Sequence, residues 1–444
     1  MKNIKLNNKK VGIWGFGIVG KSAYNYVQQY TNHIQILDKN TVDHPAWIAQ
    51  TKHNIQSFLQ NNDFIIASPG IPLHTYQDYK HKFITELDIL EQQFHGTVIA
   101  ITGTLGKTSI TNLLQQCIPS SIATGNIGYA MLNVLQQVIQ PEKIILELSS
   151  FQLQHTKKFT PQMSIWTNFY PNHLDHHLSE QEYFKAKCKI LQDQSPDHIT
   201  LLPCHLIEKI KQTISIKPQI YAFCIKQCSK HLYPTFSIKN NSIMFEHKII
   251  FDNINQLSSH TFQENWLIII TTLYLQNISL EHVTKVSNQL TSQEHRLEKI
   301  REINGSVFYN DSKSTVWQAT KQALDSLDSQ SCALFLGGLS KGTDRTPLIQ
   351  HLQNKKITVF AFGKEAHTIQ NLCNTYQVTC TSFDTLDQAF RTCTKSHSYK
   401  DILFSPAGAS FDLFKNYLVR GEYFKKLVTD LAQISTAPFE KDSI

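Results

Sequence analysis

The segment from Gly103 to Ser109 has the residue types that hold the phosphates of a nucleotide. Backbone N–H groups of such a turn can surround phosphate oxygens, Lys107 can neutralise their charge, and the Thr108 hydroxyl can reach Mg²⁺. The pattern Gly-x-x-Gly-Lys-Thr lacks the earlier glycine of the usual phosphate loop. Because the β-branched run Thr97 to Ile101 precedes it and a helical pattern follows from Ile110, we interpret it as a phosphate loop and not as a chance turn.

Further chemistry-bearing residues follow two other apolar runs. Glu147 ends the run Ile144 to Leu146, where a carboxylate ligand for a hard cation would lie beside the phosphate loop. The segment 172–177 follows the run Ser164 to Thr167, and its His173, between Asn172 and Asp175, is the histidine best placed for a metal. Taken alone, Glu147 would be interpreted as a charged residue at a strand end, and His173 as an ordinary surface or core histidine.

The first glycine cluster, Gly15, Gly17 and Gly20, follows the apolar run Val11 to Trp14 and precedes a helical pattern. A helix N-terminus of this kind suits a diphosphate. The strand predicted at Ile34 to Leu37 ends at Asp38, where an acidic side chain can meet a ribose or base. The third strand, Phe64 to Ala67, runs into a turn that begins at Ser68. A redox dinucleotide is an alternative ligand for this cluster.

Small polar and cationic segments end three strands of the last third of the chain. They follow Ser306 to Tyr309, Ala333 to Leu336 and Ile402 to Ser405, and a further strand is predicted at Thr358 to Phe362. Together these segments predict a pocket for a carboxylate or phosphate ligand, although each alone is more typical of a turn. The chain has five arginines, and two of them, Arg296 and Arg420, lie in segments that favour function.

Length and composition predict the architecture that must position these residues. The chain has 444 residues, 41% hydrophobic and 17% charged, which excludes a single small module and a disordered protein. Strands that alternate with helical patterns predict an α/β protein. We expect a Rossmann-like domain over residues 1–93, a central P-loop ATPase-like domain over 94–298 and a Rossmann-like C-terminal domain over 299–444.

Charge and cysteine usage narrow the class of protein. The net charge of +7 is spread along the chain, which suits anionic small molecules and not a nucleic acid. Nine cysteines without a C-x-x-C pattern indicate reduced thiols and a cytoplasmic protein. The apolar stretch Trp266 to Leu275 is shorter than the roughly 20 residues of a membrane span, so we expect no membrane partner. A monomer is expected.

Taken together and in their order along the chain, the motifs resemble those of the Mur ligases, and the resemblance covers nearly the whole chain. The segment Glu147 to Leu153 is the most discriminating, and Asn310 to Lys313 and Ser405 to Ala407 support the same family member. The resemblance implies an ATP-dependent ligase that adds D-glutamate to UDP-N-acetylmuramoyl-L-alanine through an acyl phosphate. Such an enzyme serves peptidoglycan precursor synthesis, and through it cell wall biogenesis, cell shape and cell division.

The resemblance also implies roles for individual residues. Catalysis would involve Lys107, Glu147, His173 and Lys187, and two Mg²⁺ would be held by Thr108, Glu147, His173 and a carbamylated Lys187. ATP would contact Gly103, Thr104, Gly106, Lys107, Thr108, Ser109, Asn265, Arg296, Asp311 and Lys313. The UDP-linked substrate would contact Gly15, Gly17, Gly20, Asp38, Ser68 and Asn126, and D-glutamate would contact Thr315, Lys341, Ser410 and Phe411.

Two alternatives remain within the same resemblance. A sister ligase would add a diamino acid or extend a folate-type polyglutamate chain. A catalytically silent nucleotide-binding relative is hinted at by Leu105 and Phe262, which replace residues more usual in the family. The division of the ATP contacts between the second and third domains also predicts domain closure, with a hinge near Lys299.

Overall fold

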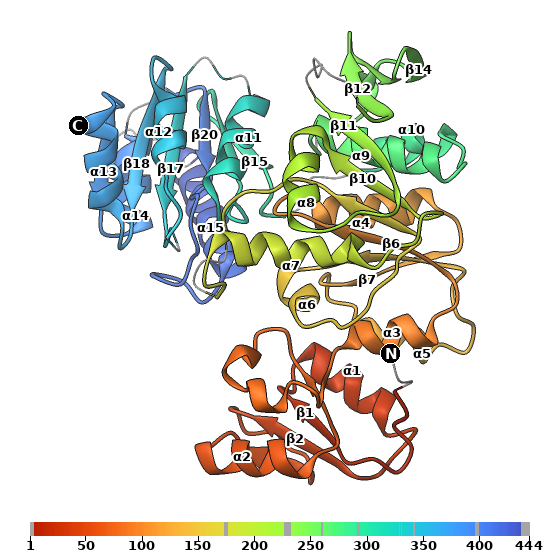
Figure 1. Cartoon of the computed structure of the whole chain (residues 1–444). Helices are drawn as coiled ribbons and strands as arrows, with labels where there is room; N and C mark the ends of the chain where they lie inside the picture. The colour runs from red at the N-terminus through yellow and green to blue at the C-terminus, as the bar shows by residue number, and fades with distance from the viewer. Residues whose placement is uncertain are drawn as a thin grey trace, which may run out of the picture. The chain divides into compact units, whose positions relative to one another are not determined.

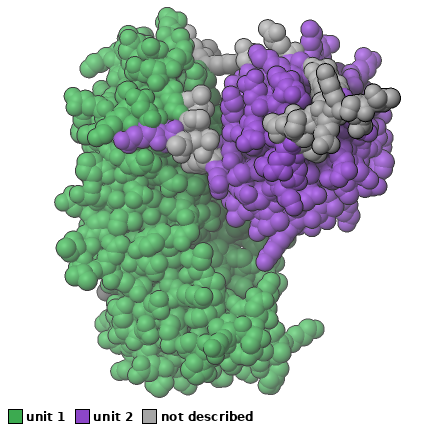
Figure 2. Space-filling model, turned by 180° about the vertical axis from the view of Figure 1, so that it is seen from behind, with its two compact units in different colours: residues 1–169, 176–288 green, residues 170–175, 289–444 purple. Residues whose placement is uncertain are grey.

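The structure is a computed structural model that describes residues 4–172, 176–225, 232–258, 261–290, 294–327, 329, 331–340, 342–395 and 399–436. Within the described residues the strands form three sheets, each the centre of one α/β domain (Figure 1). The chain forms two compact units, coloured separately in Figure 2. Residues 1–169 and 176–288 contain the first two sheets, and residues 170–175 and 289–444 contain the third. The predicted domain limits at 93/94 and 298/299 stay predictions.

The first domain is a parallel sheet with the strand order β3-β2-β1-β4-β5. Helix α1 packs on one face and helix α2 on the other, each over a separate apolar cluster. The order reverses at β1, where ligands of open parallel sheets bind. The elements are β1 Val11–Trp14, α1 Ile18–Val27, β2 Ile34–Asp38, β3 Trp47–Ala49, α2 Lys52–Asn61, β4 Phe64–Ala67, β5 Phe83–Ile84 and α3 Glu86–Gln93.

The central domain has the strand order β14-β13-β12-β11-β10-β9-β6-β8-β7. Strand β6 lies between β8 and β9, so the loops after these three parallel strands share one edge. The strands are β6 Thr97–Thr102, β7 Ser121–Gly125, β8 Lys143–Glu147, β9 Met163–Trp166, β10 Ile199–Pro203, β11 Gln219–Cys224, β12 Thr235–Lys239, β13 Ser242–Phe245 and β14 Lys248–Phe251. Strands β12 to β14 pair antiparallel.

Helices cover both faces of the central sheet. Helices α7 and α8 contribute to the apolar cluster of one face, and α4 lies against α9 and β8. Helix α9 is buried over most of its length, as its nearly continuous apolar sequence predicts. The helices are α4 Lys107–Cys117, α5 Leu132–Leu135, α6 Ser150–Gln154, α7 Glu180–Gln192, α8 Ile207–Thr213, α9 Gln263–Leu275 and α10 Glu281–Asn288.

The C-terminal domain has the strand order β15-β16-β20-β17-β18-β19, parallel except for the β15–β16 pair. Helices α11 to α13 pack on one face and α14 and α15 on the other. The elements are β15 Glu298–Ile303, β16 Ser306–Asn310, α11 Trp317–Leu327, β17 Cys332–Gly337, α12 Thr346–Leu352, β18 Ile357–Phe362, α13 Ala366–Thr375, β19 Cys380–Phe383, α14 Leu386–Thr394, β20 Asp401–Phe404 and α15 Tyr417–Thr436.

Helix α3 connects the first two domains and is fastened to the central domain by its carboxylates. Asp88 completes a capping box with Thr85 and also accepts a hydrogen bond of 2.7 Å from the backbone N–H of Lys157. Glu91 accepts hydrogen bonds from the backbone N–H and the hydroxyl of Thr160. These bonds join the end of the first domain to the segment that precedes β9.

The predicted α/β fold class is confirmed, and every predicted strand is present within one or two residues of its expected limits. Helix α4 begins at Lys107 and not at Ile110, because Gly106 in the left-handed conformation ends the loop there. In the part of the chain that the structure describes, no helix has the length and apolar character needed to cross a membrane. The cysteines described there are free thiols.

Candidate active site

The predicted phosphate loop connects β6 to α4. Gly103 has φ +144° and Gly106 has φ +84°, conformations that suit glycine. A Cβ atom on Gly106 would lie 2.6 Å from the Asn265 Oδ1 atom, so Asn265 of α9 is packed directly against the loop. Lys107, Thr108 and Ser109 form the first turn of α4, whose N–H groups have no partner within the helix. The loop therefore presents the N-terminus of a helix to an anion.

Glu147 lies at the end of β8, in register with Ile101 of the neighbouring β6. Its side chain is 1% exposed, and the Asn126 side-chain amide donates to Oε1 over 3.0 Å. The Asn126 backbone N–H also donates to the Glu147 carbonyl oxygen. Oε2 has no hydrogen-bond partner among the described residues. A buried carboxylate oxygen without a hydrogen-bond partner, at the end of the strand next to β6, fits a hard cation such as Mg²⁺.

Lys187 of α7 reaches the same loop from the other side. Its Nζ atom donates to the Gly103 carbonyl oxygen over 2.8 Å and lies 4.7 Å from the centre of the Tyr183 ring. The side chain is 1% exposed. Burial lowers the pKa of Lys187 well below its usual value, and the charge of Lys107 lowers it further, while Glu147 acts in the opposite direction. These surroundings therefore favour the neutral form of the amine more than those of an exposed lysine do.

His173 lies outside the described residues, so its place relative to Glu147 stays a prediction. Its neighbour His177 is described and is 1% exposed. The His177 Nε2 atom is 2.9 Å from the Ser150 hydroxyl, and its ring stacks on Phe151. The segment after β9 is thus connected to α6, which begins directly after the β8 end.

The glycine cluster of the first domain forms a tight turn between β1 and α1. A Cβ atom on Gly20 would lie 1.9 Å from the Gly15 carbonyl oxygen, so only glycine allows this approach. Asp38 at the end of β2 accepts a hydrogen bond of 2.6 Å from the Phe16 N–H, and the Ser68 hydroxyl donates to the Gly15 carbonyl oxygen over 3.2 Å. The structure brings Gly15, Gly20, Asp38 and Ser68 together, and Gly17 is the N-cap of α1.

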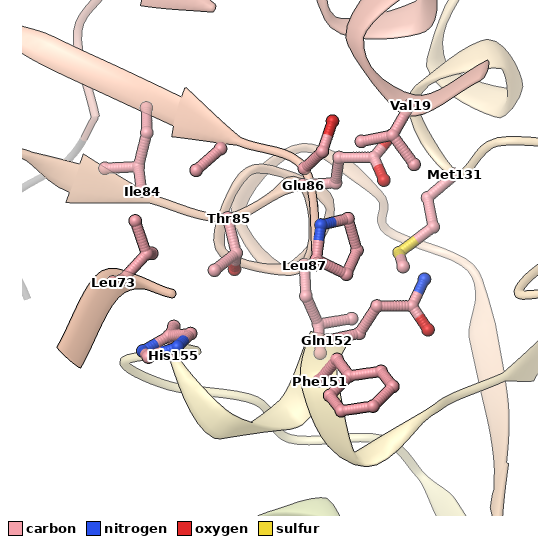
Figure 3. A pocket seen from close by; sticks show the side chains of 13 residues that line it. Val19, Leu73, Ile84, Thr85, Glu86, Leu87, Met131, Phe151, Gln152 and His155 are labelled. Carbon is pink, nitrogen blue, oxygen red and sulfur yellow. The ribbon is translucent and has the colours of Figure 1, made fainter. Parts of the chain in front are cut away.

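A narrow pocket lies beside Ser68 and within the first compact unit (Figure 3). It leaves about 20 Å³ for a water-sized group, the room of about one ordered water. Figure 3 shows His155 at the opposite end of the pocket from Met131. Glu86 and Gln152 supply polar groups, and the Glu86 Oε1 atom has no partner among the described residues.

Burial shifts the pKa of both titratable groups in this pocket toward the neutral form. It raises the pKa of Glu86 to about 8, although a hydrogen bond from the Leu132 backbone opposes the shift. It lowers the pKa of His155 to about 4, helped by the nearby charges of Lys189, His176 and His74. The pocket therefore holds a protonated carboxyl group and a neutral imidazole near neutral pH.

In the C-terminal domain the predicted residues gather at the ends of β16 and β20. Asp311 accepts hydrogen bonds from the Ser405 hydroxyl, 2.6 Å, and the Leu297 N–H, 3.1 Å. Burial raises its pKa to about 7, while these bonds and the charges of Arg296 and Arg420 oppose the shift. The Lys313 Nζ atom lies 5.8 Å from the centre of the Tyr417 ring. Arg296, Asp311 and Lys313 thus lie in one region of this domain.

The predicted amino-acid pocket is described in part. Thr315 is half-buried after β16, Ser410 is buried after β20, and Phe411 is 64% exposed. Lys341 lies outside the described residues, so its position stays a prediction.

Two buried arginines, absent from the predicted site, hold the loops of this region. Arg420 donates to the Ser312 hydroxyl and carbonyl and to the Gly408 carbonyl, and Arg345 donates to the carbonyls of Ala407, Gly337 and Gly338. Arg345 also pairs with Glu365. The scarcity of arginine and the position of Arg420 before a glycine were the available signals in the sequence. Nothing in the sequence singled out Arg345.

One cluster of His and Glu side chains has the geometry of a metal site elsewhere in this domain. The ligand atoms of Glu294, His295 and Glu422 lie within 4.8 Å of one another. Lys425 already forms ion pairs with Glu294 and Glu422, at 3.3 and 3.1 Å. The positive charge beside these carboxylates is thus supplied by Lys425 of the chain itself.

The chain is similar to known proteins in the sequence of its central part and in its fold. Residues 101–268 match the family model of the Mur ligase middle domain. The crystal structure of MurF from Acinetobacter baumannii has a TM-score of 0.58 at 16% identity, covering 93% of this chain and 88% of that chain. MurF ligase from Thermotoga maritima, solved in complex with ADP, has a TM-score of 0.55 at 13% identity and covers 96% of each chain. The resemblance to the Mur ligases is confirmed, in sequence and in fold.

A curated relative is similar to nearly the whole chain. The UDP-N-acetylmuramoylalanine–D-glutamate ligase of Oenococcus oeni is 28% identical over 441 residues, covering 96% of this chain and 98% of that protein. The similarity therefore extends through all three domains.

Proposed function

We propose that this chain is an ATP-dependent ligase that joins D-glutamate to UDP-N-acetylmuramoyl-L-alanine. The observation that carries the proposal is the arrangement of Lys107, Glu147 and Lys187 around the loop after β6, on neighbouring elements of one sheet. The name of the Oenococcus relative and the Glu147 to Leu153 segment support the choice of D-glutamate. Because ATP and UDP-linked precursors are cytoplasmic metabolites, the proposal places the enzyme in the cytoplasm.

The reaction needs two steps because a carboxylate resists attack by an amine. A carboxylate oxygen of the alanyl group attacks the γ-phosphorus of ATP, and the bond to ADP breaks. The amine of D-glutamate then attacks the acyl carbon, inorganic phosphate leaves, and the amine releases a proton. Both steps bring anions together, so the main task of the protein is to stabilise negative charge. We find no step that requires a covalent bond to a side chain.

Lys107 and the first N–H groups of α4 are proposed to hold the triphosphate. Gly103, Thr104, Gly106 and Ser109 complete the loop, and Asn265 adjoins it. Thr108 and Glu147 would hold one Mg²⁺, with His173 and a carbamylated Lys187 at a second. Bound Mg²⁺ would neutralise the charge that develops between the phosphates and the attacking carboxylate. The oxygen donors at Thr108 and Glu147 fit such an ion.

The nucleotide substrate is proposed to bind along the first compact unit. Gly15, Gly17 and Gly20 would face its diphosphate, with Asp38 and Ser68 beside the uridine end and Asn126 near Glu147. The pocket in Figure 3 joins these regions, because Val19 and Ser68 adjoin the glycine turn and Gln152 follows Glu147 by five residues. The pocket has room for about one water, so it adjoins this path and does not itself hold the N-acetylmuramoyl group.

The C-terminal domain is proposed to supply the remaining contacts. Arg296, Asp311 and Lys313 would contact ATP. The pocket for D-glutamate would be formed by Thr315, Lys341, Ser410 and Phe411. We propose that the enzyme is a monomer. The small polar loops at the ends of β16, β17 and β20 support this assignment, since they lie at one edge of the sheet.

The experiment is to measure ADP formation from ATP with UDP-N-acetylmuramoyl-L-alanine, with and without D-glutamate. ADP formation that depends on D-glutamate, and not on L-lysine or diaminopimelate, is expected. The reverse amino-acid preference would indicate a sister ligase. Nucleotide binding without substrate-dependent ADP would indicate a silent relative. Lys107→Ala should abolish turnover, and Lys248→Ala, an exposed lysine on β14, should leave it unchanged.

A further inference from the structure

Two residues that follow β9, Thr167 and Asn168, lie directly against the phosphate loop. The Thr167 N–H donates to the Thr102 carbonyl over 2.9 Å, and the Trp166 indole N–H donates to the Asn168 carbonyl over 3.0 Å. Thr167 is 1% and Asn168 5% exposed. A Cβ atom on Gly103 would lie 2.0 Å from the Thr167 hydroxyl oxygen, so the loop and this segment fit without a gap. Their relative position is set by the β6–β9 pairing.

The Asn168 side chain binds both backbone polar groups of Leu105, its N–H and its carbonyl oxygen. Its Oδ1 atom accepts hydrogen bonds from the N–H groups of Leu105 and Thr104, at 2.8 and 3.2 Å. Its Nδ2 atom donates to the Leu105 carbonyl over 3.2 Å, and the Thr167 hydroxyl donates to the same oxygen over 2.7 Å. The amide is therefore used at both its acceptor end and its donor end.

These bonds decide which way the loop peptide faces. The two residues between Gly103 and Gly106 have access to several backbone orientations, and only those that keep carbonyl oxygens away from the phosphates leave a binding surface of N–H groups. Because Asn168 and Thr167 both donate to the Leu105 carbonyl, this oxygen is held toward the segment after β9. The contact is to the backbone, which explains how the loop accommodates an apolar residue at position 105.

We propose that Asn168 is a positioning residue for the nucleotide, acting through the Leu105 peptide and not by touching ATP. The inference rests on the proposed function, because it concerns the same phosphate loop. It assigns a role to the strand end after β9 that is separate from metal binding by the segment beyond it. Loss of the amide should weaken nucleotide binding more than it weakens binding of the UDP-linked substrate.

The test compares Asn168→Ala and Asn168→Asp in the full chain. The aspartate keeps an acceptor for the two N–H groups but loses the donor to the Leu105 carbonyl and adds negative charge near the phosphates. Asn62→Ala is the matched control, because Asn62 is also buried and donates to Gln35 and Phe58, at 2.9 and 2.8 Å, in the first domain. Calorimetry with Mg·ADP gives the nucleotide affinity, and initial rates give KM for ATP and for the UDP-linked substrate.

We expect both Asn168 variants to bind Mg·ADP about tenfold more weakly, with aspartate the weaker, while KM for the UDP-linked substrate changes less than about twofold. Asn62→Ala should lower the melting temperature without changing nucleotide affinity. Unchanged Mg·ADP affinity in both Asn168 variants would overturn the inference and leave only a structural role. Thr167→Val removes the second donor to Leu105 and serves if the Asn168 variants do not fold. A wild type that binds Mg·ADP but forms no ADP from the substrates would overturn the proposed function alone.

Discussion

Lys107 and Lys187 donate hydrogen bonds to the same atom, the Gly103 carbonyl oxygen, at 3.0 and 2.8 Å. One lysine is the first residue of α4 and the other comes from α7. Two amines around one acceptor repel each other if both are charged, and Lys187 is the more deeply buried. The surroundings of Lys187 therefore favour its neutral form, while Lys107 stands at the N-terminus of α4, where a triphosphate is proposed to bind.

A neutral Lys187 amine can add carbon dioxide, forming an N–C bond and releasing a proton. We expect enzyme prepared in ¹³C-bicarbonate to show a carbamate signal by NMR that Lys187→Ala lacks. Short carboxylic acids should restore part of the activity of Lys187→Ala, because they replace the missing carboxylate. Lys189→Ala is the control on the same helix, since the Lys189 amine donates hydrogen bonds to the carbonyls of Gln154 and Thr156. If short carboxylic acids raised the activity of Lys187→Ala and Lys189→Ala to the same extent, the assignment of a carbamate to Lys187 would be contradicted.

Replacing Glu147 by glutamine should lower turnover by about 100-fold or more, because one oxygen that faces the loop becomes a neutral amide. The requirement for Mg²⁺ should rise in a titration of activity against magnesium. Glu142→Gln changes an exposed carboxylate just before β8 and should leave both quantities unchanged. An unaltered magnesium requirement in Glu147→Gln would show that this carboxylate holds no metal.

Glu86 should make stability depend on pH. Its folded-state pKa of about 8 lies above the ordinary value of 4.5, so folding favours the protonated form, and the stability it contributes is lost as pH rises through this window. Glu86→Gln stays neutral and avoids the loss. The melting temperature of the variant relative to the wild type should therefore increase between about pH 4.5 and 8 and level off above that range. A difference that is constant with pH would exclude a raised pKa.

Arg420 should be intolerant of lysine. Burial lowers its pKa to about 10, and its fork holds the loops after β16 and β20 together. Arg420→Lys leaves carbonyls unpaired and should cost on the order of 3 kcal/mol of unfolding free energy, together with a higher KM for D-glutamate. The exposed Arg391 gives the comparison, since Arg391→Lys should change stability by less than about 0.5 kcal/mol. Denaturant unfolding measures both variants.

The strand-to-helix turns could be predicted because their physical requirements are local. Gly15, Gly20, Gly103 and Gly106 follow apolar runs, and the structure shows close approaches at Gly15, Gly20 and Gly103 that leave no room for a side chain and a positive φ at Gly106. The adjacency of Glu147 to the phosphate loop followed from parallel strand ends. The short strands β3 and β5 were not predicted, because two or three residues carry no periodic pattern.

Other features of the site depend on contacts between distant segments and gave no signal in the sequence. The pocket that contains Glu86 and His155 is built from segments of the first and central domains, so its burial and its pKa shifts could not be read from either segment. The role of Asn168 arises from bonds to a backbone peptide more than 60 residues away. His173, Lys341 and the hinge near Lys299 stay predictions.

The bonds from Asp88 and Glu91 to the 157–160 backbone have a consequence for substrate choice. They hold α3, at the end of the first domain, against the segment before β9, and so limit how far the glycine turn of the first domain can move from the phosphate loop of the second. Under the proposed function, the substrate must span the interval between these loops, with its diphosphate at one end and its reactive acid at the other. The enzyme would then select substrates by their length. A precursor that is shorter or longer by one residue would place its carboxylate away from the γ-phosphate of ATP.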